Sequence, residues 1–174
     1  MAKRNPSPAE QALYARVFGS SLPSPERIYI SDDLGLGDRP WTQPRWFMDM
    51  MDRVRGGGFR WEINIGPDGY RDCTSSAAGA WGDRIDVTFI HELTHVWEGF
   101  HATVPDTYFF RAAWAQAIDT LGIGDAYSYR LGMAWDDYTV EQKAEIVGDW
   151  YKFGMSTSDP RFPFIRDNIR RGVY

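Results

Sequence analysis

Residues 85–102, IDVTFIHELTHVWEGFHA, carry all three histidines of the chain, two of them inside a regular apolar repeat. Apolar side chains recur every three or four positions in this stretch, which predicts a buried helix. His91 and His95 then lie one turn apart on the same face of that helix. Because an imidazole pair is costly to bury without a partner, this face predicts a metal site rather than ordinary core packing.

A carboxylate follows the first histidine directly, in the pentapeptide His91-Glu92-Leu-Thr-His95. Two imidazole nitrogens at this spacing can bind zinc at about 2.0–2.1 Å without straining the helix. Glu92 projects about 100° away around the helix, so it can reach a water at the metal and act as a general base. The pentapeptide therefore predicts one Zn²⁺ per chain, with two histidine ligands and Glu92 as a catalytic residue.

A catalytic zinc site needs a third protein ligand. Residues 139–151, TVEQKAEIVGDWY, predict a second helix with Glu141, Glu145 and Asp149 at successive turns of one face. Glu145 is the preferred ligand, and Glu141 remains an alternative. Asp149 is placed to hold the outer nitrogen of a ligand histidine. His101 is less suitable, since on a continuing helix it lies away from the face of the histidine pair.

Amide hydrolysis also needs a hydrogen-bond donor for the oxyanion that develops in the reaction. Tyr127 and Tyr129, in the stretch AYSYR, are the first candidates, and Tyr138 and His101 are further ones. A strand expected in WEINIG, residues 61–66, can offer its edge to an extended peptide. The expected partner is a peptide or protein substrate, and a peptide, a peptidoglycan crosslink and a folded protein all remain open as the bond that is cleaved.

The two motifs together resemble those of the gluzincins, the thermolysin-like zinc metallopeptidases. The pentapeptide HELTH is followed downstream by EIVGD at residues 145–149. The wording FIHELTHVW and VEQKAEIVGDWY is also similar to small bacterial metallopeptidase-like domains associated with polymorphic toxins and secretion systems. The resemblance covers about residues 89–151, and it departs from the gluzincin pattern at Ala144, where those proteins often have Asn.

The resemblance implies a zincin-like fold and a complete set of roles. By that resemblance, the metal ligands are His91, His95 and Glu145. Glu92 is the general base, and Asp149 is the carboxylate that holds a ligand histidine. The resemblance also implies, as partners beyond the substrate, a cognate inhibitor or immunity protein. The alternative to a zinc metallopeptidase is a non-catalytic, zinc-stabilised binding domain of a secretion- or phage-related assembly. Glu92 favours the enzyme, because a closed structural zinc site needs no base.

The pattern over all 174 residues predicts one α+β domain, 1–174, predominantly helical with a small sheet. Ser7, Pro8 and Glu10 are typical of a helix start, and Gly19 of its end. RIYIS and FRWEIN predict strands, and a Pro67-Asp68-Gly69 turn with a partner strand is expected after the second. Residues 34–44 predict a loop, and further helices are expected at 44–58, 85–102, 106–124, 136–154 and 159–172.

Charge and composition limit the partners. The net charge is −5 without a basic run, which argues against nucleic acid or an anionic membrane as the main partner. The single cysteine, Cys73, cannot close an intrachain disulfide. The first residues lack the apolar segment of a signal peptide, so we expect cytoplasmic synthesis, with export by a Sec-independent secretion system left open.

Overall fold

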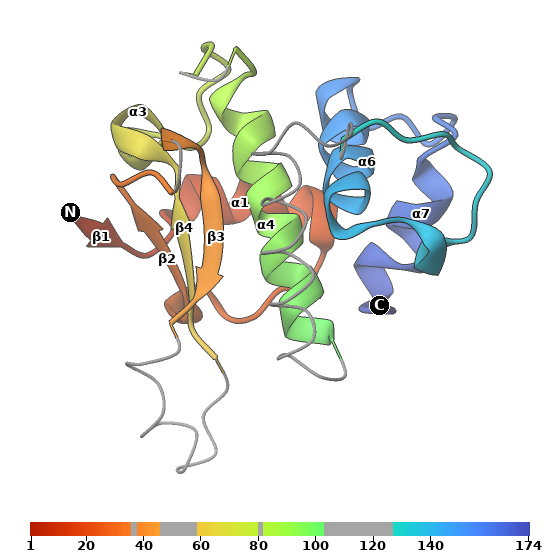
Figure 1. The fold of residues 1–174 in the computed structure, drawn as a ribbon, viewed down its shortest axis with the longest axis horizontal. Coiled ribbons are helices and arrows are strands. Elements are labelled where there is room, and N and C mark those ends of the chain that lie inside the picture. The colour runs from red at the N-terminus through yellow and green to blue at the C-terminus, as the bar shows by residue number, and fades with distance from the viewer. Residues whose placement is uncertain (36–37, 46–58, 80–81, 103–126) are drawn as a thin grey trace.

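A four-stranded mixed sheet lies at one side of the computed structural model, which describes residues 1–35, 38–45, 59–79, 82–102 and 127–174 (Figure 1). Its strands are β1 (Lys3–Arg4), β2 (Ile28–Ser31), β3 (Trp41–Pro44) and β4 (Trp61–Asn64), in the order β1-β2-β4-β3. The inner strands β2 and β4 run parallel, and the outer strands β1 and β3 pair antiparallel with them. The prediction that the WEINIG strand offers a free edge to a peptide is therefore wrong, because β4 is paired with β2 on one side and β3 on the other.

The two faces of this sheet differ in chemistry, as the alternation of side chains along the inner strands requires. Ile28, Ile30 and Ile63 are fully buried on one face, in the main apolar core. Glu62 lies on the opposite face, where the Lys3 ammonium is 2.6 Å and the Arg45 guanidinium 3.5 Å from its Oε2. One face of the sheet is thus available to pack against helices.

The apolar face shares its core with α1 (Pro8–Phe18) and α4 (Ile85–His101). In α4, 13 of the 17 residues are buried, so this helix is covered on several sides and not along one stripe. The sheet lies on one side of α4, and α6 (Val140–Lys152) and α7 (Phe162–Asp167) lie on the other (Figure 1). Single turns at Pro25–Arg27, Trp135–Asp137 and Ile169–Arg171 complete the helical segments.

The close approach of α4 to the sheet depends on Gly99. A Cβ at this position would overlap the ring of Trp61 in β4, so no larger residue fits without a shift of the helix or the ring. Gly148, on α6, is different, because a Cβ there would be 3.9 Å from Cβ of His91, an ordinary contact distance. A side chain at position 99 of α4 therefore has no room beside Trp61, whereas one at position 148 of α6 has room beside His91.

α4 and α6 pack side by side in antiparallel orientation. Near one end of the pair, the Tyr151 hydroxyl lies 2.8 Å from a carboxylate oxygen of Asp86. Further along, Glu141 at the start of α6 reaches His91 and His95 in the middle of α4. The two sequence motifs, separated by more than forty residues, are thus brought together along one helix–helix contact.

Several predicted elements are confirmed. α1 and α6 both begin with complete capping boxes, Ser7 with Glu10 and Thr139 with Gln142. β2 and β4 lie where RIYIS and WEIN were expected, and α4 ends at His101. The last predicted helix is present as α7 followed by a 3-10 turn. The expected helices at 44–58 and 106–124 lie outside the described residues, apart from Pro44, which ends β3, and Arg45, which follows it.

Two local predictions are wrong. The expected loop at 34–44 contains the edge strand β3, whose short WTQP sequence has little alternation to signal a strand. The expected turn and partner strand after β4 are instead α3 (Gly66–Arg71). Gly66 adopts a φ of 76° that turns the chain, and Pro67 stands at the first helical positions, where its fixed φ favours a helix.

Within the described part of the chain, no helix is long and apolar enough to cross a bilayer. The sheet and the helices pack on one shared apolar core, which agrees with the predicted α+β class.

Candidate metal centre

Three potential ligand atoms converge where α4 and α6 meet. Nε2 of His91 lies 3.2 Å from Nε2 of His95. Each of these nitrogens lies 3.4 Å from Oε2 of Glu141. All three side chains are largely buried, with 14%, 9% and 4% of their surface exposed, respectively. These atoms form a nearly equilateral triangle of two nitrogens and one oxygen, a donor set that could hold a metal ion.

The size of this triangle fits a tetrahedral zinc ion. Zinc binds nitrogen and carboxylate oxygen at about 2.0–2.1 Å, and a tetrahedron with such bonds has edges of about 3.3 Å. The three measured separations, 3.2, 3.4 and 3.4 Å, lie close to that value. The three atoms therefore match one triangular face of a zinc tetrahedron, and the fourth ligand position is left for a group other than these three residues.

The outer nitrogens of both histidines also face carboxylates. Oε1 of Glu145 lies 3.3 Å from Nδ1 of His91. Oε2 of Glu98 lies 3.1 Å from Nδ1 of His95, and the Glu98 side chain is fully buried. A proton on each Nδ1 can be donated to these acceptors, which leaves both Nε2 lone pairs directed at the shared centre.

The charges around the cluster favour a cation. Burial would lower the pKa of His91, but Glu141 and Glu145 outweigh it and raise that pKa to about 9. The pKa of His95 is raised well above its usual value, because Glu141 and Glu98 outweigh burial there too. Burial would raise the pKa of Glu141, yet the two imidazoles hold it well below its usual range. The site therefore stabilises positive charge, carried either by protons or by a metal ion.

Glu92 lies on the sheet side of this cluster and is held by the edge strand. The Thr42 hydroxyl of β3 lies 2.7 Å from Oε2 of Glu92 and 3.1 Å from its backbone carbonyl oxygen. Only 5% of Glu92 is exposed, and burial raises the pKa of its carboxyl group. A buried carboxylate with a raised pKa, next to two imidazoles, is an arrangement typical of a general base.

Two of the three acidic residues of α6, Glu145 and Asp149, have other contacts than those that the sequence indicated. Glu141, the alternative ligand, faces both Nε2 atoms, whereas Glu145 faces the outer nitrogen of His91. Asp149 instead accepts a hydrogen bond of 2.6 Å from the Tyr129 hydroxyl and lies 3.6 Å from the Arg161 guanidinium. Since α6 rises about 1.5 Å per residue, Asp149 lies about 12 Å along the helix axis from Glu141 and meets other partners.

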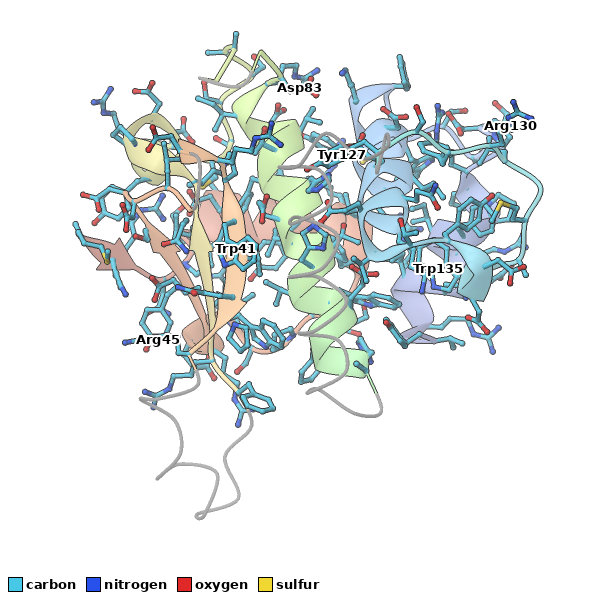
Figure 2. All side chains as sticks on the ribbon, in the orientation of Figure 1. Trp41, Arg45, Asp83, Tyr127, Arg130 and Trp135 are labelled. Carbon is cyan, nitrogen blue, oxygen red and sulfur yellow. The ribbon has the colours of Figure 1, made fainter. Side chains whose placement is uncertain are left out.

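The two tyrosines that the sequence offered as oxyanion donors also lie in different places, one near the histidines and one away from them. Tyr127 lies between α4 and α6 (Figure 2), with its ring centroid 6.3 Å from that of His91. The Tyr129 hydroxyl is bonded to Asp149 and accepts from Nε of Arg161 at 2.7 Å. Of these two tyrosines, Tyr127 is the one whose ring lies beside the cluster.

The two further candidates have structural partners elsewhere. The Tyr138 hydroxyl donates to the Arg130 carbonyl at 2.8 Å. His101 contacts the Ser21 carbonyl through Nε2 at 2.7 Å and packs beside Trp97 at the end of α4. Because α4 continues to His101, this histidine stays on a different side of the helix from the cluster, as the helical spacing predicts.

Two residues at the centre were not found by sequence reasoning. Glu98 stands three positions after His95, a spacing that places it on the same helix face, and this signal was present in the sequence. Thr42 carried no such signal, because it lies fifty residues before Glu92 in a short strand. Only the pairing of β3 with β4 beside α4 brings Thr42 into contact with Glu92.

Comparison with known proteins gives one partial similarity. The chain is 37% identical over 90 residues to the type VI secretion system spike protein VgrG2b of Pseudomonas aeruginosa. The match covers 48% of this chain but only 8% of that protein. No protein-family model matches the chain, and no solved structure matches it.

Proposed function

We propose that this protein is a zinc-dependent metallopeptidase with a zincin-like fold. The observation that supports it best is the triangle of His91, His95 and Glu141, with edges of 3.2–3.4 Å, beside the buried Glu92. Two histidines and one carboxylate are the protein ligands of several catalytic zinc sites, which keep a fourth position open. The reaction is hydrolysis of a peptide or amide bond.

The ligand set that we propose is His91, His95 and Glu141, with Glu141 in place of Glu145. Glu145 and Glu98 orient the two histidines through their outer nitrogens. When bound here, zinc supplies a Lewis acid that acidifies a water molecule and polarises the carbonyl of the scissile bond. The protein holds the ligands in place by the packing of α4 against α6.

Glu92 is the proton carrier of the reaction. Its carboxylate accepts a proton from the attacking water and then delivers that proton to the nitrogen of the leaving amine. Thr42 fixes the carboxylate by its 2.7 Å contact, so that the second oxygen is left for the water. Tyr127, next to His91, is the proposed donor to the developing oxyanion.

A second proposal concerns where the protein acts. The partial similarity to a type VI secretion spike protein supports an association with such a secretion apparatus. It equally supports the alternative function, a zinc-stabilised binding domain of the apparatus without turnover. In that case the domain would bind partners within the secretion apparatus and no bond would be cleaved, whereas a cognate inhibitor or immunity protein belongs to the peptidase proposal.

One experiment separates the two functions. Purified protein is loaded with zinc and incubated with a mixture of unfolded proteins, and new peptide termini are identified by mass spectrometry. Glu92→Gln serves as the matched control, because it should keep zinc and lose all cleavage. Zinc-loaded wild-type protein that produces no new termini, or cleavage that persists in Glu92→Gln, would contradict the metallopeptidase proposal.

A further inference from the structure

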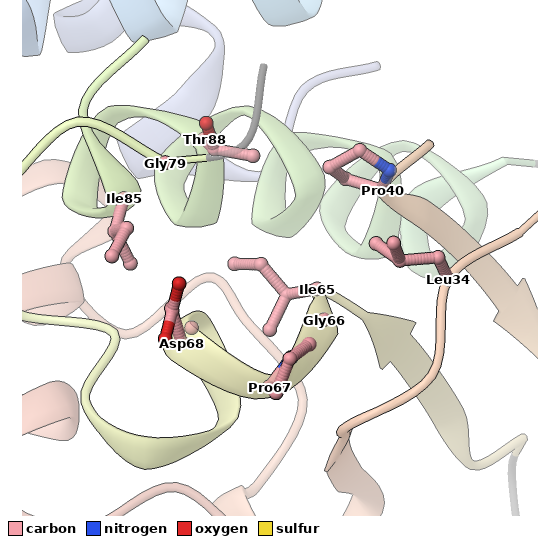
Figure 3. Close-up of a pocket in the computed structure, with 10 residues that line it drawn as sticks. Leu34, Pro40, Ile65, Gly66, Pro67, Asp68, Gly79, Ile85 and Thr88 are labelled. Carbon is pink, nitrogen blue, oxygen red and sulfur yellow. The ribbon is translucent and has the colours of Figure 1, made fainter. Parts of the chain in front are cut away.

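A small hollow lies between the beginning of α4 and the first turn of α3 (Figure 3). Ile85 and Thr88 of α4 form one wall, and Ile65 with the first turn of α3 forms the opposite wall. Leu34 and Pro40 close one end. The hollow has a volume of about 80 Å³. Since a cavity of about 150 Å³ takes a benzene molecule, this space suits a branched aliphatic side chain.

The chemistry of the walls is mostly apolar. Among the described residues that line the hollow, Asp68 alone carries a charge. The Asp68 side chain is 67% exposed and lies 3.8 Å from the Arg71 guanidinium, so its charge is directed at solvent and at a neighbouring cation. The interior is therefore suited to an apolar group, which gains free energy when it leaves water.

Both walls of the hollow continue to the catalytic base. On α4, Thr88 lies one helical turn before Glu92, a rise of about 6 Å along the axis. On the strand side, Pro40 lies two residues before Thr42, which holds Glu92. Two residues of extended chain span about 6.6 Å. If a substrate runs past Glu92 in an extended conformation, the side chain two residues from the one beside Glu92 therefore reaches the hollow.

We propose that this hollow is a specificity subsite for one aliphatic side chain, leucine, isoleucine or valine, two residues away from the cleaved bond. The proposal rests on the proposed peptidase function. It assigns Thr88 and Leu34 a role in substrate selection that is separate from the metal ligands and the base.

Cleavage of a peptide library tests the proposal. We expect leucine, isoleucine or valine to be favoured at least fivefold over glycine and aspartate at one position, two residues from the cleaved bond. Absence of a preference there would overturn the proposal. A preference for lysine or arginine would also overturn it and would assign recognition to Asp68.

Two variants change the size of the hollow in opposite directions. Thr88→Leu fills it, and the preference should move to glycine or alanine, while Leu34→Ala enlarges it and should admit phenylalanine. Thr88 loses only a 3.2 Å contact with the Arg84 carbonyl, so zinc content and melting temperature should stay close to those of the wild type. An unchanged cleavage profile in folded, zinc-containing Thr88→Leu would contradict the subsite.

A binding measurement separates failure of the subsite from failure of the peptidase proposal. Methyl NMR on zinc-loaded Glu92→Gln records the Ile65 and Ile85 signals during titration with an acetylated, amidated Gly-Gly-Leu-Gly peptide and its all-glycine counterpart. Saturable shifts with the leucine peptide alone support the hollow even if nothing is cleaved, in which case only the peptidase proposal fails. If peptides are cleaved without an aliphatic preference and the methyl signals do not shift, the subsite proposal fails and the peptidase proposal stands.

Discussion

Oε2 of Glu98 lies 3.1 Å from Nδ1 of His95, and both residues belong to the same helix, α4. The helix that provides two proposed ligands therefore also provides the carboxylate that orients one of them. Burial raises the pKa of Glu98, but the adjacent His95 and Lys143 oppose that rise. The orientation of His95 thus depends on a contact three residues along the helix and needs no distant segment.

Replacement of Glu98 should weaken zinc binding without unfolding the protein. In Glu98→Leu, His95 loses the acceptor for its Nδ1 proton, and we expect zinc affinity to fall about 10–100-fold. Competition with a chromophoric zinc chelator measures the change. Asp149→Asn is the matched control, because Asp149 contacts Tyr129 and Arg161 and should leave the affinity unaltered. Equal losses in both variants would contradict the role of Glu98.

The two acidic residues at the start of α6 should differ in their effect on metal content. Glu141→Ala removes a proposed ligand, so purified protein should contain less than a tenth of the wild-type zinc. Glu145→Ala removes only the partner of the outer nitrogen of His91, and most of the zinc should remain. Metal analysis by mass spectrometry after dialysis decides between them, and the opposite order would restore Glu145 as the ligand.

Thr42 offers a test of how Glu92 is positioned. Thr42→Val keeps the shape of the side chain and removes the hydroxyl that lies 2.7 Å from Oε2 of Glu92. A hydrogen bond to a charged group contributes about 1.5–3 kcal/mol, so kcat for a peptide substrate should fall at least tenfold. KM and zinc content should stay within twofold. A normal kcat in this variant would show that the base needs no support from β3.

The roles of these acidic residues illustrate what the sequence can and cannot reveal. Helical periodicity correctly placed His91 and His95 on one face of a helix. It also placed Glu141 and Glu145 on a second helix, α6. It could not choose between Glu141 and Glu145, because that choice depends on how far α6 slides along α4. The sliding is set by contacts such as Tyr151 with Asp86, which join residues 65 positions apart.

In the fold too, elements that depend on nearby residues were predicted, and the strand that depends on a distant partner was not. Caps, turns and apolar repeats lie within a few residues of the elements they specify, and α1, α4 and α6 were predicted with their starts. The strand β3 was missed because its WTQP sequence becomes a strand only by pairing with β4. Thr42, and with it the contact that holds Glu92, was missed for the same reason.

Acid should destabilise the fold through Glu10. Burial would raise the pKa of this carboxyl group, but Arg4 and the backbone N–H groups of Ser7 and Cys73 outweigh it and lower the pKa to about 2. A depressed pKa stabilises the folded state above the unfolded value of 4.5, and the benefit is lost as the pH falls from about 4.5 to about 2.

Denaturant unfolding at a series of pH values measures this contribution. The fall of the Glu10 pKa from 4.5 to about 2 corresponds to roughly 3 kcal/mol of unfolding free energy. We expect Glu10→Gln to be less stable than the wild type by about that amount at pH 6, with the difference shrinking toward pH 2.5. A difference that does not change with pH would exclude the ionised carboxylate as its source.

Two glycines inside helices should respond to alanine in opposite ways. Gly99→Ala drives a methyl group into the Trp61 ring, and we expect a loss of about 2–3 kcal/mol of unfolding free energy. Gly148→Ala meets only ordinary contacts and should gain about 0.5–1 kcal/mol from higher helix propensity. Thermal and urea unfolding of the two proteins, measured with zinc present, compares them directly. A stabilised Gly99→Ala would contradict the close packing of α4 on β4.

The antiparallel pairing of α4 with α6 has a consequence for how folding responds to the environment. A dication shared by His91, His95 and Glu141 would join two segments separated by more than forty residues, as a covalent crosslink would. Binding to the folded chain alone adds its free energy to stability by mass action, so an abundant ion would lock the helices together and a scarce one would release them. Zinc availability in the compartment where the protein arrives would then decide its resistance to unfolding and degradation.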